Sequence, residues 1–232
     1  MKIYEPGNAA KQAIFLQLEQ SLGQEARYIL DLACGDGHLW KTFLEAHPQV
    51  SVVGLDSDAQ AIERGKKQAP ARLDLRVFDA QQMFEDRLFD VVVAFSAVEH
   101  VVDRPAFLRT VWKALKPGGY AYLNYDVGHF RSRSLKERAM VPVSQFLALM
   151  GIEGPYMKRV DDVLFLKQAR SQGFGLQAVQ KHNLHPLKGF FRGATDEGIS
   201  AWLEFEQRMN ALFSPEQLDQ IMWSTTVILK KP

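Results

Sequence analysis

The chain has 232 residues, of which 47% are hydrophobic and 24% charged, and its formal net charge at pH 7 is +1. This length provides for one large domain with a sizeable core, and the near-neutral charge argues against a general nucleic-acid binder. The one cysteine, Cys34, excludes an internal disulfide framework and a multi-cysteine metal site. No apolar run has the length or position of a signal peptide or a membrane span, so we expect a soluble, cytoplasmic protein without a membrane partner.

Short apolar runs alternate with amphipathic stretches through the first two-thirds of the chain, which is typical of a parallel α/β sheet. The runs are rich in β-branched and aromatic residues, and several are apolar almost throughout, as strands covered on both faces are. The strands expected in this part are residues 28–32, 50–55, 73–78, 89–95 and 120–125. Asp103 before Pro105 marks the start of a helix that the KPGG run at 116–119 ends.

The alternation of apolar runs with amphipathic stretches becomes less regular after residue 125. Residues 131–159 hold six basic and two acidic side chains, a local balance of +4, and predict a helix near 143–150 between loops. Two further helices are expected over residues 161–172 and 195–213, and two strands over 176–182 and 223–229. No repeat, low-complexity run or linker interrupts the chain, which favours one domain with insertions.

The most informative stretch is ILDLACGDGH, residues 29–38. An apolar strand leads into Asp31, and Gly35 and Gly37 follow in a loop where glycine lets the backbone turn tightly and lets a ligand approach it. The next two strands lead into Asp56 and Asp79. A carboxylate at the second strand end can accept hydrogen bonds from both ribose hydroxyls, and this edge is where α/β sheets bind ligands.

The pattern separates the possible nucleotide ligands. A dinucleotide loop needs a third glycine where this chain has Trp40, and the chain has no Gly-Lys-Ser/Thr sequence of a phosphate-binding loop. Carboxylates at three successive strand ends suit a ligand with an ammonium group, a ribose and an adenine amino group, and they repel a pyrophosphate. An NAD-dependent oxidoreductase is therefore disfavoured.

These motifs, in this order, resemble the class I, Rossmann-like S-adenosylmethionine-dependent methyltransferases, specifically their small-molecule branch. The resemblance covers about residues 28–125 and rests on residues 29–37, 54–56, 78–80, 89–93 with 98–100, and 115–119. Ala33 departs from the pattern, because glycine is more usual there, but alanine is a small change.

The resemblance implies an α/β fold in one domain, residues 1–232. The expected sheet is Rossmann-like, seven-stranded and mostly parallel, with helices on both faces and an antiparallel last strand. Residues 1–27 would form an N-terminal lid containing Tyr4, 28–125 the cofactor-binding core, and 126–160 and 186–222 helical substrate-cap insertions.

The implied cofactor is S-adenosyl-L-methionine, with S-adenosyl-L-homocysteine as the product. Asp31 would hold its methionine part, Asp56 its ribose and Asp79 its adenine amino group, while Ser96 would lie near the sulfonium. The cofactor-binding residues implied are Asp31, Ala33, Cys34, Gly35, Gly37, Asp56, Ser57, Asp79, Ala80, Phe95 and Ser96.

Three side chains are candidates for catalysis because they lie at or just beyond the ends of the fourth and fifth strands: His100, Tyr125 and His129. Histidine suits a general base because its charge changes near neutral pH. His182 and His185 have no cysteine or carboxylate beside them in sequence, so we expect them to be structural and expect no metal.

The expected acceptor is a nitrogen, oxygen or carbon of a small molecule. Phe146, Met150, Phe190 and Trp202 could roof an apolar pocket, and the basic side chains of residues 131–159 could pair with an anionic group on the acceptor. The sequence at 95–98, FSAV, lacks the loop with which this superfamily methylates exocyclic base amines. RNA methylation by another chemistry and a non-catalytic cofactor-binding protein stay open as alternatives, and so does a homodimer.

Overall fold

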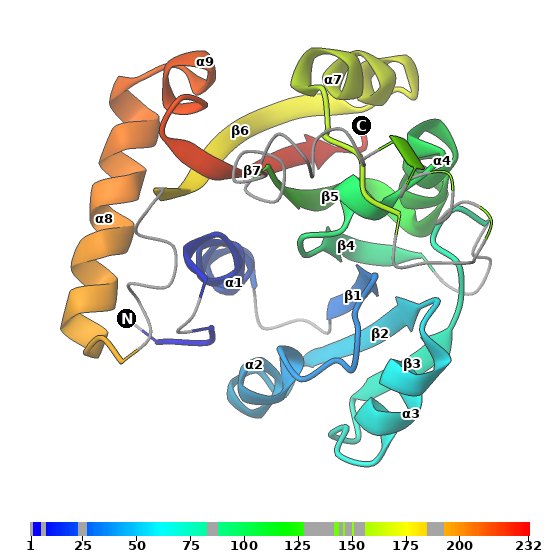
Figure 1. Ribbon diagram of the computed structural model, residues 1–232. Helices are drawn as coiled ribbons and strands as arrows, with labels where there is room; N and C mark the ends of the chain where they lie inside the picture. Colours follow the sequence, from blue (N-terminus) through cyan, green and yellow to red (C-terminus); the bar gives the residue numbers. More distant parts are fainter. Residues whose placement is uncertain are drawn as a thin grey trace.

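The computed structural model describes residues 2–5, 8–22, 27–82, 88–127, 142–143, 146, 150, 156–184 and 193–232. Across these residues the chain forms one twisted sheet with helices on both faces (Figure 1). The expected helix near 143–150 lies mostly outside the described residues. None of the helices within the described residues combines the length and the apolar character needed to cross a bilayer.

The sheet has seven strands in the order β3-β2-β1-β4-β5-β7-β6. β7 pairs antiparallel with both β5 and β6, whereas the pairs from β3 through to β5 are parallel. The strands are β1 (Arg27–Leu32), β2 (Val50–Asp56), β3 (Leu73–Val77), β4 (Phe89–Ala94), β5 (Leu115–Asp126), β6 (Gly175–Leu184) and β7 (Met222–Lys230). The predicted fold class is therefore confirmed, including the antiparallel last strand.

Most boundaries lie within two residues of the prediction, and the start of β5 differs most. β5 begins at Leu115 rather than at residue 120, because Leu115 pairs with Phe89 before a register shift between Phe89 and Val91. The helix before it still ends where the sequence indicated, at Ala114. The KPGG run therefore ends the helix and lies in an irregular first part of the strand.

The first face of the sheet is covered by α1 (Ala9–Ser21), α2 (Trp40–Ala46) and α3 (Ala59–Lys66). Their apolar side chains form an aromatic core in which Phe15 packs against Trp40 and Phe43, with ring centroids 5.3 and 5.1 Å apart. Tyr4 belongs to this core, and its hydroxyl bonds Glu19 and His47. The N-terminal segment thus packs firmly onto α1 and α2.

The second face is covered by α4 (Arg104–Ala114) and α7 (Asp162–Ser171). Asp103 caps α4 by accepting a hydrogen bond from the Ala106 amide at 2.9 Å, as its position before Pro105 predicted. A short 3-10 turn, η1 (Val98–His100), follows β4. Along the chain, α8 (Asp196–Leu212) and α9 (Pro215–Leu218) follow β6 and precede β7. Figure 1 shows α8 beside α1, on the far side of the β6–β7 edge from α7.

Candidate functional site

The loop after β1 is held in a left-handed conformation and tied to the end of β2. Ala33, Gly35 and Gly37 have φ angles of 61°, 59° and 71°. The Gly35 amide donates to Asp56 Oδ2 at 2.7 Å, and the Asp58 amide donates to Asp56 Oδ1 at 2.8 Å. Ala33 adopts its left-handed angle without being glycine, at a cost of about 1–2 kcal/mol. The loop conformation therefore survives the departure from the usual glycine.

Asp31 is the most unusual group at this edge. It is 1% exposed, and its Oδ2 accepts a hydrogen bond from the Trp40 indole at 2.6 Å. Its Oδ1 is buried and finds no hydrogen-bond partner in the described part of the chain. Burial raises the pKa of Asp31 to about 7, although the Trp40 hydrogen bond and the charge of Lys11 act in the opposite direction. A cationic hydrogen-bond donor beside Oδ1 would favour the ionised form of this carboxyl group.

Trp40 is a site residue that sequence reasoning did not identify. The sequence used it only as a side chain too large for a dinucleotide loop. In the structure its ring is fully buried at the start of α2, and its N–H is the hydrogen bond that orients Asp31. The signal available was its distance from Asp31, but sequence alone does not show which way an indole points.

Asp79 completes the row of strand-end carboxylates. The Phe78 amide donates to the Asp56 carbonyl at 2.8 Å, so the end of β3 lies directly beside the end of β2. Asp79 Oδ1 accepts from the Gln81 amide at 2.9 Å, which fixes the turn that carries Ala80. Asp31, Asp56 and Asp79 thus follow three adjacent parallel strands at one edge of the sheet.

The end of β4 is fixed by an asparagine on the neighbouring strand. Ser96 has a φ of 50°, and its amide and hydroxyl both donate to Asn124 Oδ1, at 3.1 and 3.3 Å. Asn124 is fully buried and donates in turn to Ser224 Oγ and the Thr225 carbonyl, both at 3.0 Å. Phe95 packs against Phe15, with ring centroids 5.3 Å apart. Sequence reasoning named Ser96 and Phe95 but not Asn124.

The predicted catalytic residues lie in different surroundings. His100 is half-buried, and its Nδ1 is 2.9 Å from the Tyr156 carbonyl oxygen. Tyr125 is fully buried on the α7 face, where its hydroxyl donates to Asp162 at 2.8 Å, and burial raises the pKa of Tyr125. His129 lies outside the described residues. The structure therefore does not bring Tyr125 together with the loop after β1.

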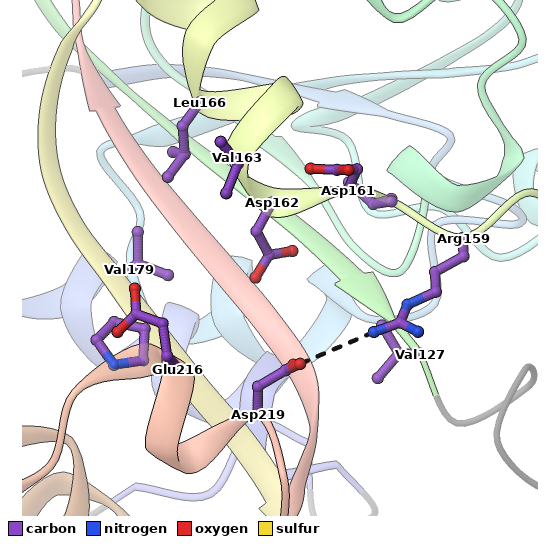
Figure 2. Close-up of a pocket in the computed structure, with 11 residues that line it drawn as sticks. Val127, Arg159, Asp161, Asp162, Val163, Leu166, Val179, Glu216 and Asp219 are labelled. Carbon is purple, nitrogen blue, oxygen red and sulfur yellow. Dashed lines mark ion pairs between the residues drawn. The ribbon is translucent and has the colours of Figure 1, made fainter.

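A cavity of about 530 Å³ opens beyond the end of β5, on the α7 face of the sheet (Figure 2). Val127 and Arg159, from the expected cap segment 126–160, line it. So do Glu216 and Asp219, from the expected cap segment 186–222. Arg159 Nη2 and Asp219 Oδ2 are 3.8 Å apart across the cavity. Its remaining lining residues are Val160, Asp161, Asp162, Val163, Leu166, Val179 and Pro215.

The cavity adjoins the turn that carries His100. The Lys158 amide donates to the Glu99 carbonyl at 2.8 Å, and the Asp126 amide donates to Glu99 Oε1 at 3.1 Å. The segment entering α7 and the end of β5 are therefore both fixed against η1.

Residues 30–121 match a family model described as a methyltransferase domain. Among curated proteins, the chain is 30% identical over 112 residues to trans-aconitate 2-methyltransferase of Deinococcus radiodurans, covering 47% of this chain and 43% of that protein. It is 37% identical over 99 residues to ubiquinone biosynthesis O-methyltransferase of Methylobacterium nodulans, covering 41% of this chain and 39% of that protein. These alignments thus span less than half the length of either relative.

A solved structure with a similar fold is an S-adenosylmethionine-dependent methyltransferase from Mesorhizobium loti. Its TM-score is 0.60 at 20% identity, and the match covers 95% of this chain and 97% of that one. The similarity of fold therefore extends over the parts of the chain that the family model does not match.

Proposed function

We propose that this chain, which contains a class I methyltransferase domain with the Rossmann-like fold, transfers a methyl group from S-adenosyl-L-methionine to a small-molecule acceptor. The observation that carries the proposal is a buried oxygen of Asp31 that finds no hydrogen-bond partner among the described residues, beside a left-handed loop tied to Asp56. The cofactor has an ammonium group for Asp31 and a ribose diol for Asp56. When bound, it supplies a methyl group already activated on a sulfonium.

The remaining assignments follow from the positions of the strand ends. We assign Asp79 and Ala80, after β3, to the adenine, and the backbone from Ala33 to Gly37 to the methionine part. We assign Ser57 to the ribose, and Phe95 and Ser96, where β4 ends, to the sulfonium. Cys34 contributes backbone only, because burial raises the pKa of its thiol.

This chain's own contribution to the reaction is to place the acceptor and, where needed, to remove its proton. His100 is our candidate base. A carbonyl oxygen can only accept, so Nδ1 of His100 carries the hydrogen that Tyr156 accepts, and the neutral ring offers Nε2 as the proton acceptor. Tyr125 reaches the cavity of Figure 2 only through Asp162, so we assign it a positioning role there.

We assign the cavity of Figure 2 to the part of the acceptor away from its reacting atom, because residues of both expected cap segments line it, whereas His100 and the loop after β1 do not. Its apolar side chains would exclude water around the acceptor. Four carboxylates line it. Arg159 pairs with Asp219, and the buried Lys181 pairs with both Asp162 and Asp219, so two negative charges remain in excess and the described lining favours an uncharged or cationic acceptor group. The anionic acceptor expected from the sequence depends on Arg131 and Arg133, which lie outside the described residues.

Asp56→Ala is expected to weaken cofactor binding by about 1–3 kcal/mol, because the ribose would lose charge-assisted hydrogen bonds. The Gly35 amide would also lose its acceptor, so the loop would be held less firmly. Isothermal titration with S-adenosyl-L-homocysteine measures the change. Asp74→Ala on the exposed side of β3 is the control, and unchanged affinity in Asp56→Ala would contradict the ribose assignment.

The function is tested with cofactor labelled in its methyl group, incubated with the protein and a fractionated cell extract. Label in the small-metabolite fraction, reduced with Asp56→Ala, supports the proposal and yields a product to identify. Label in RNA or in protein would refute the small-molecule acceptor. Cofactor binding without transfer to any fraction would favour the non-catalytic alternative. A cytoplasmic location and a homodimer remain expectations from the sequence.

A further inference from the structure

A second cavity, of about 350 Å³, lies on the opposite face of the sheet from the cavity of Figure 2. It is an open cavity lined by α1, β6 and α8, which Figure 1 shows next to one another. Ala13, Leu16, Ala178 and Leu203 form its apolar part. Five amide side chains also line it: Gln17, Gln20, Gln180, Gln207 and Asn210. Gln17 Nε2 donates to Gln180 Oε1 at 2.7 Å, which joins α1 to β6 along the cavity.

A buried pair of ionisable side chains, His182 and Glu206, lines the same cavity. His182 is 5% exposed and Glu206 1% exposed. Glu206 Oε2 lies 3.0 Å from His182 Nδ1, while Oε1 accepts from the Asn183 amide and from the Trp202 indole, both at 2.9 Å. Three donors therefore converge on one carboxylate, which holds the imidazole in a fixed orientation.

The other ring nitrogen of His182 is left over. Its Nε2 is buried and has no hydrogen-bond partner among the residues that the structure describes. Because Glu206 accepts the hydrogen of Nδ1, the neutral ring presents a lone pair at Nε2. A buried polar atom left unsatisfied costs about 1–3 kcal/mol, which a ligand with a suitable donor would recover once side-chain movement opens the way to Nε2, an atom with almost no accessible surface in the free protein.

We propose that this cavity is a second ligand site, which takes a small, largely apolar molecule whose hydroxyl or N–H group donates to His182 Nε2. The apolar walls select the body of such a ligand, and the His182–Glu206 pair selects one donor on it. The site differs from the cavity of Figure 2, which lies on the α7 face, although Val179 of β6 lines both. The proposal does not depend on methyl transfer.

The site has a physical connection to the loop after β1. Ala13, Leu16 and Gln17 line the cavity from one side of α1, whereas Phe15 on the other side packs against Trp40, which orients Asp31. A ligand that shifts α1 would therefore change the contact of Phe15 with Trp40, and through it the orientation of Asp31.

Two probes that differ by one donor test the proposal. The first is 4-propylphenol, whose hydroxyl can donate, and the second is 4-propylanisole, which has the same apolar body without a donor. We expect the phenol to saturate one site in isothermal titration and to bind about tenfold more tightly than the anisole, the value of one good hydrogen bond. The ¹⁵N resonance of His182 Nε2 is expected to shift with the phenol only.

Two variants locate the binding. His182→Phe keeps a ring but removes the acceptor, so the preference for the phenol is expected to disappear. Ala13→Phe fills the cavity from α1 and is expected to abolish binding of both probes without touching His182. This second variant keeps the test decisive where His182→Phe does not fold, as judged by circular dichroism. Equal affinity for the two probes, no saturable binding, or unchanged binding in Ala13→Phe would each overturn the proposal.

Discussion

Affinity for S-adenosyl-L-methionine is expected to rise about tenfold from pH 6 to pH 8, because the ionised fraction of Asp31 rises by that factor around a pKa near 7. The neutral carboxyl of the free protein must lose its proton to pair with the cofactor's ammonium group. Titration calorimetry in buffers of different ionisation enthalpy measures both the affinity and the proton released at pH 6. The result tests the assignment of Asp31 directly.

Asp31→Asn is the matched variant, since it keeps the shape and cannot ionise. Its affinity is expected to be low and independent of pH, about 1.5–3 kcal/mol weaker than the wild type at pH 8, the range for a hydrogen bond to a charged group. Trp40→Phe removes the one hydrogen bond that lowers the pKa of Asp31 and is expected to move the midpoint to higher pH. A wild-type affinity that does not change between pH 6 and pH 8 would contradict the assignment.

The same group makes the stability of the free protein depend on pH. Burial raises the folded-state pKa of Asp31 from 3.8 to about 7, so between these values the native state holds a proton that the unfolded state has released. The free energy of unfolding therefore falls as pH rises through this window, by on the order of 4 kcal/mol in total. Urea unfolding at pH 5 and pH 8 measures the upper part of this window, where the expected loss is about 2–3 kcal/mol, and the loss is expected to be absent in Asp31→Asn.

The sequence was sufficient for the sheet and for the row of strand-end carboxylates. Both depend on local signals: an apolar run of strand length, and an acidic residue or glycine where the run stops. Parallel strands end at one edge of a sheet, so Asp31, Asp56 and Asp79 had to lie together once the strands were identified. The register shift that moves the start of β5 to Leu115 has no such local signal.

The sequence was not sufficient where a role depends on which face of the sheet a side chain meets. Tyr125 and Asn124 are neighbours on β5, yet Tyr125 points to Asp162 on the α7 face, and Asn124 bonds Ser96. Alternation along a strand shows that the two side chains point to opposite faces, but it does not show which residue each side chain contacts there. The sequence likewise did not show the hydrogen-bond partners of Trp40 and His182, because these partners lie on other elements.

Gly65 in α3 packs directly against the backbone of the loop after β1. A Cβ at this position would overlap the Asp36 carbonyl oxygen and would lie 2.6 Å from Leu75 Cδ1. The Asp36 oxygen belongs to the backbone between Gly35 and Gly37, so it cannot turn away as a flexible side chain would. Gly65→Ala is therefore expected to displace the loop and to destabilise the fold by about 1–3 kcal/mol, the range for overpacking.

The displaced loop is expected to reduce cofactor affinity by at least tenfold as well, because the Gly35 amide moves away from Asp56. Gly198→Ala in α8 is the matched control, since its Cβ would meet nothing closer than Thr195 Oγ1 at 3.5 Å. Alanine is the better helix former, so this variant is expected to gain about 0.5–1 kcal/mol and to bind the cofactor normally. Urea unfolding and titration with S-adenosyl-L-homocysteine compare the two variants. If Gly65→Ala matched Gly198→Ala in both measurements, the close packing of α3 would not be what holds the loop.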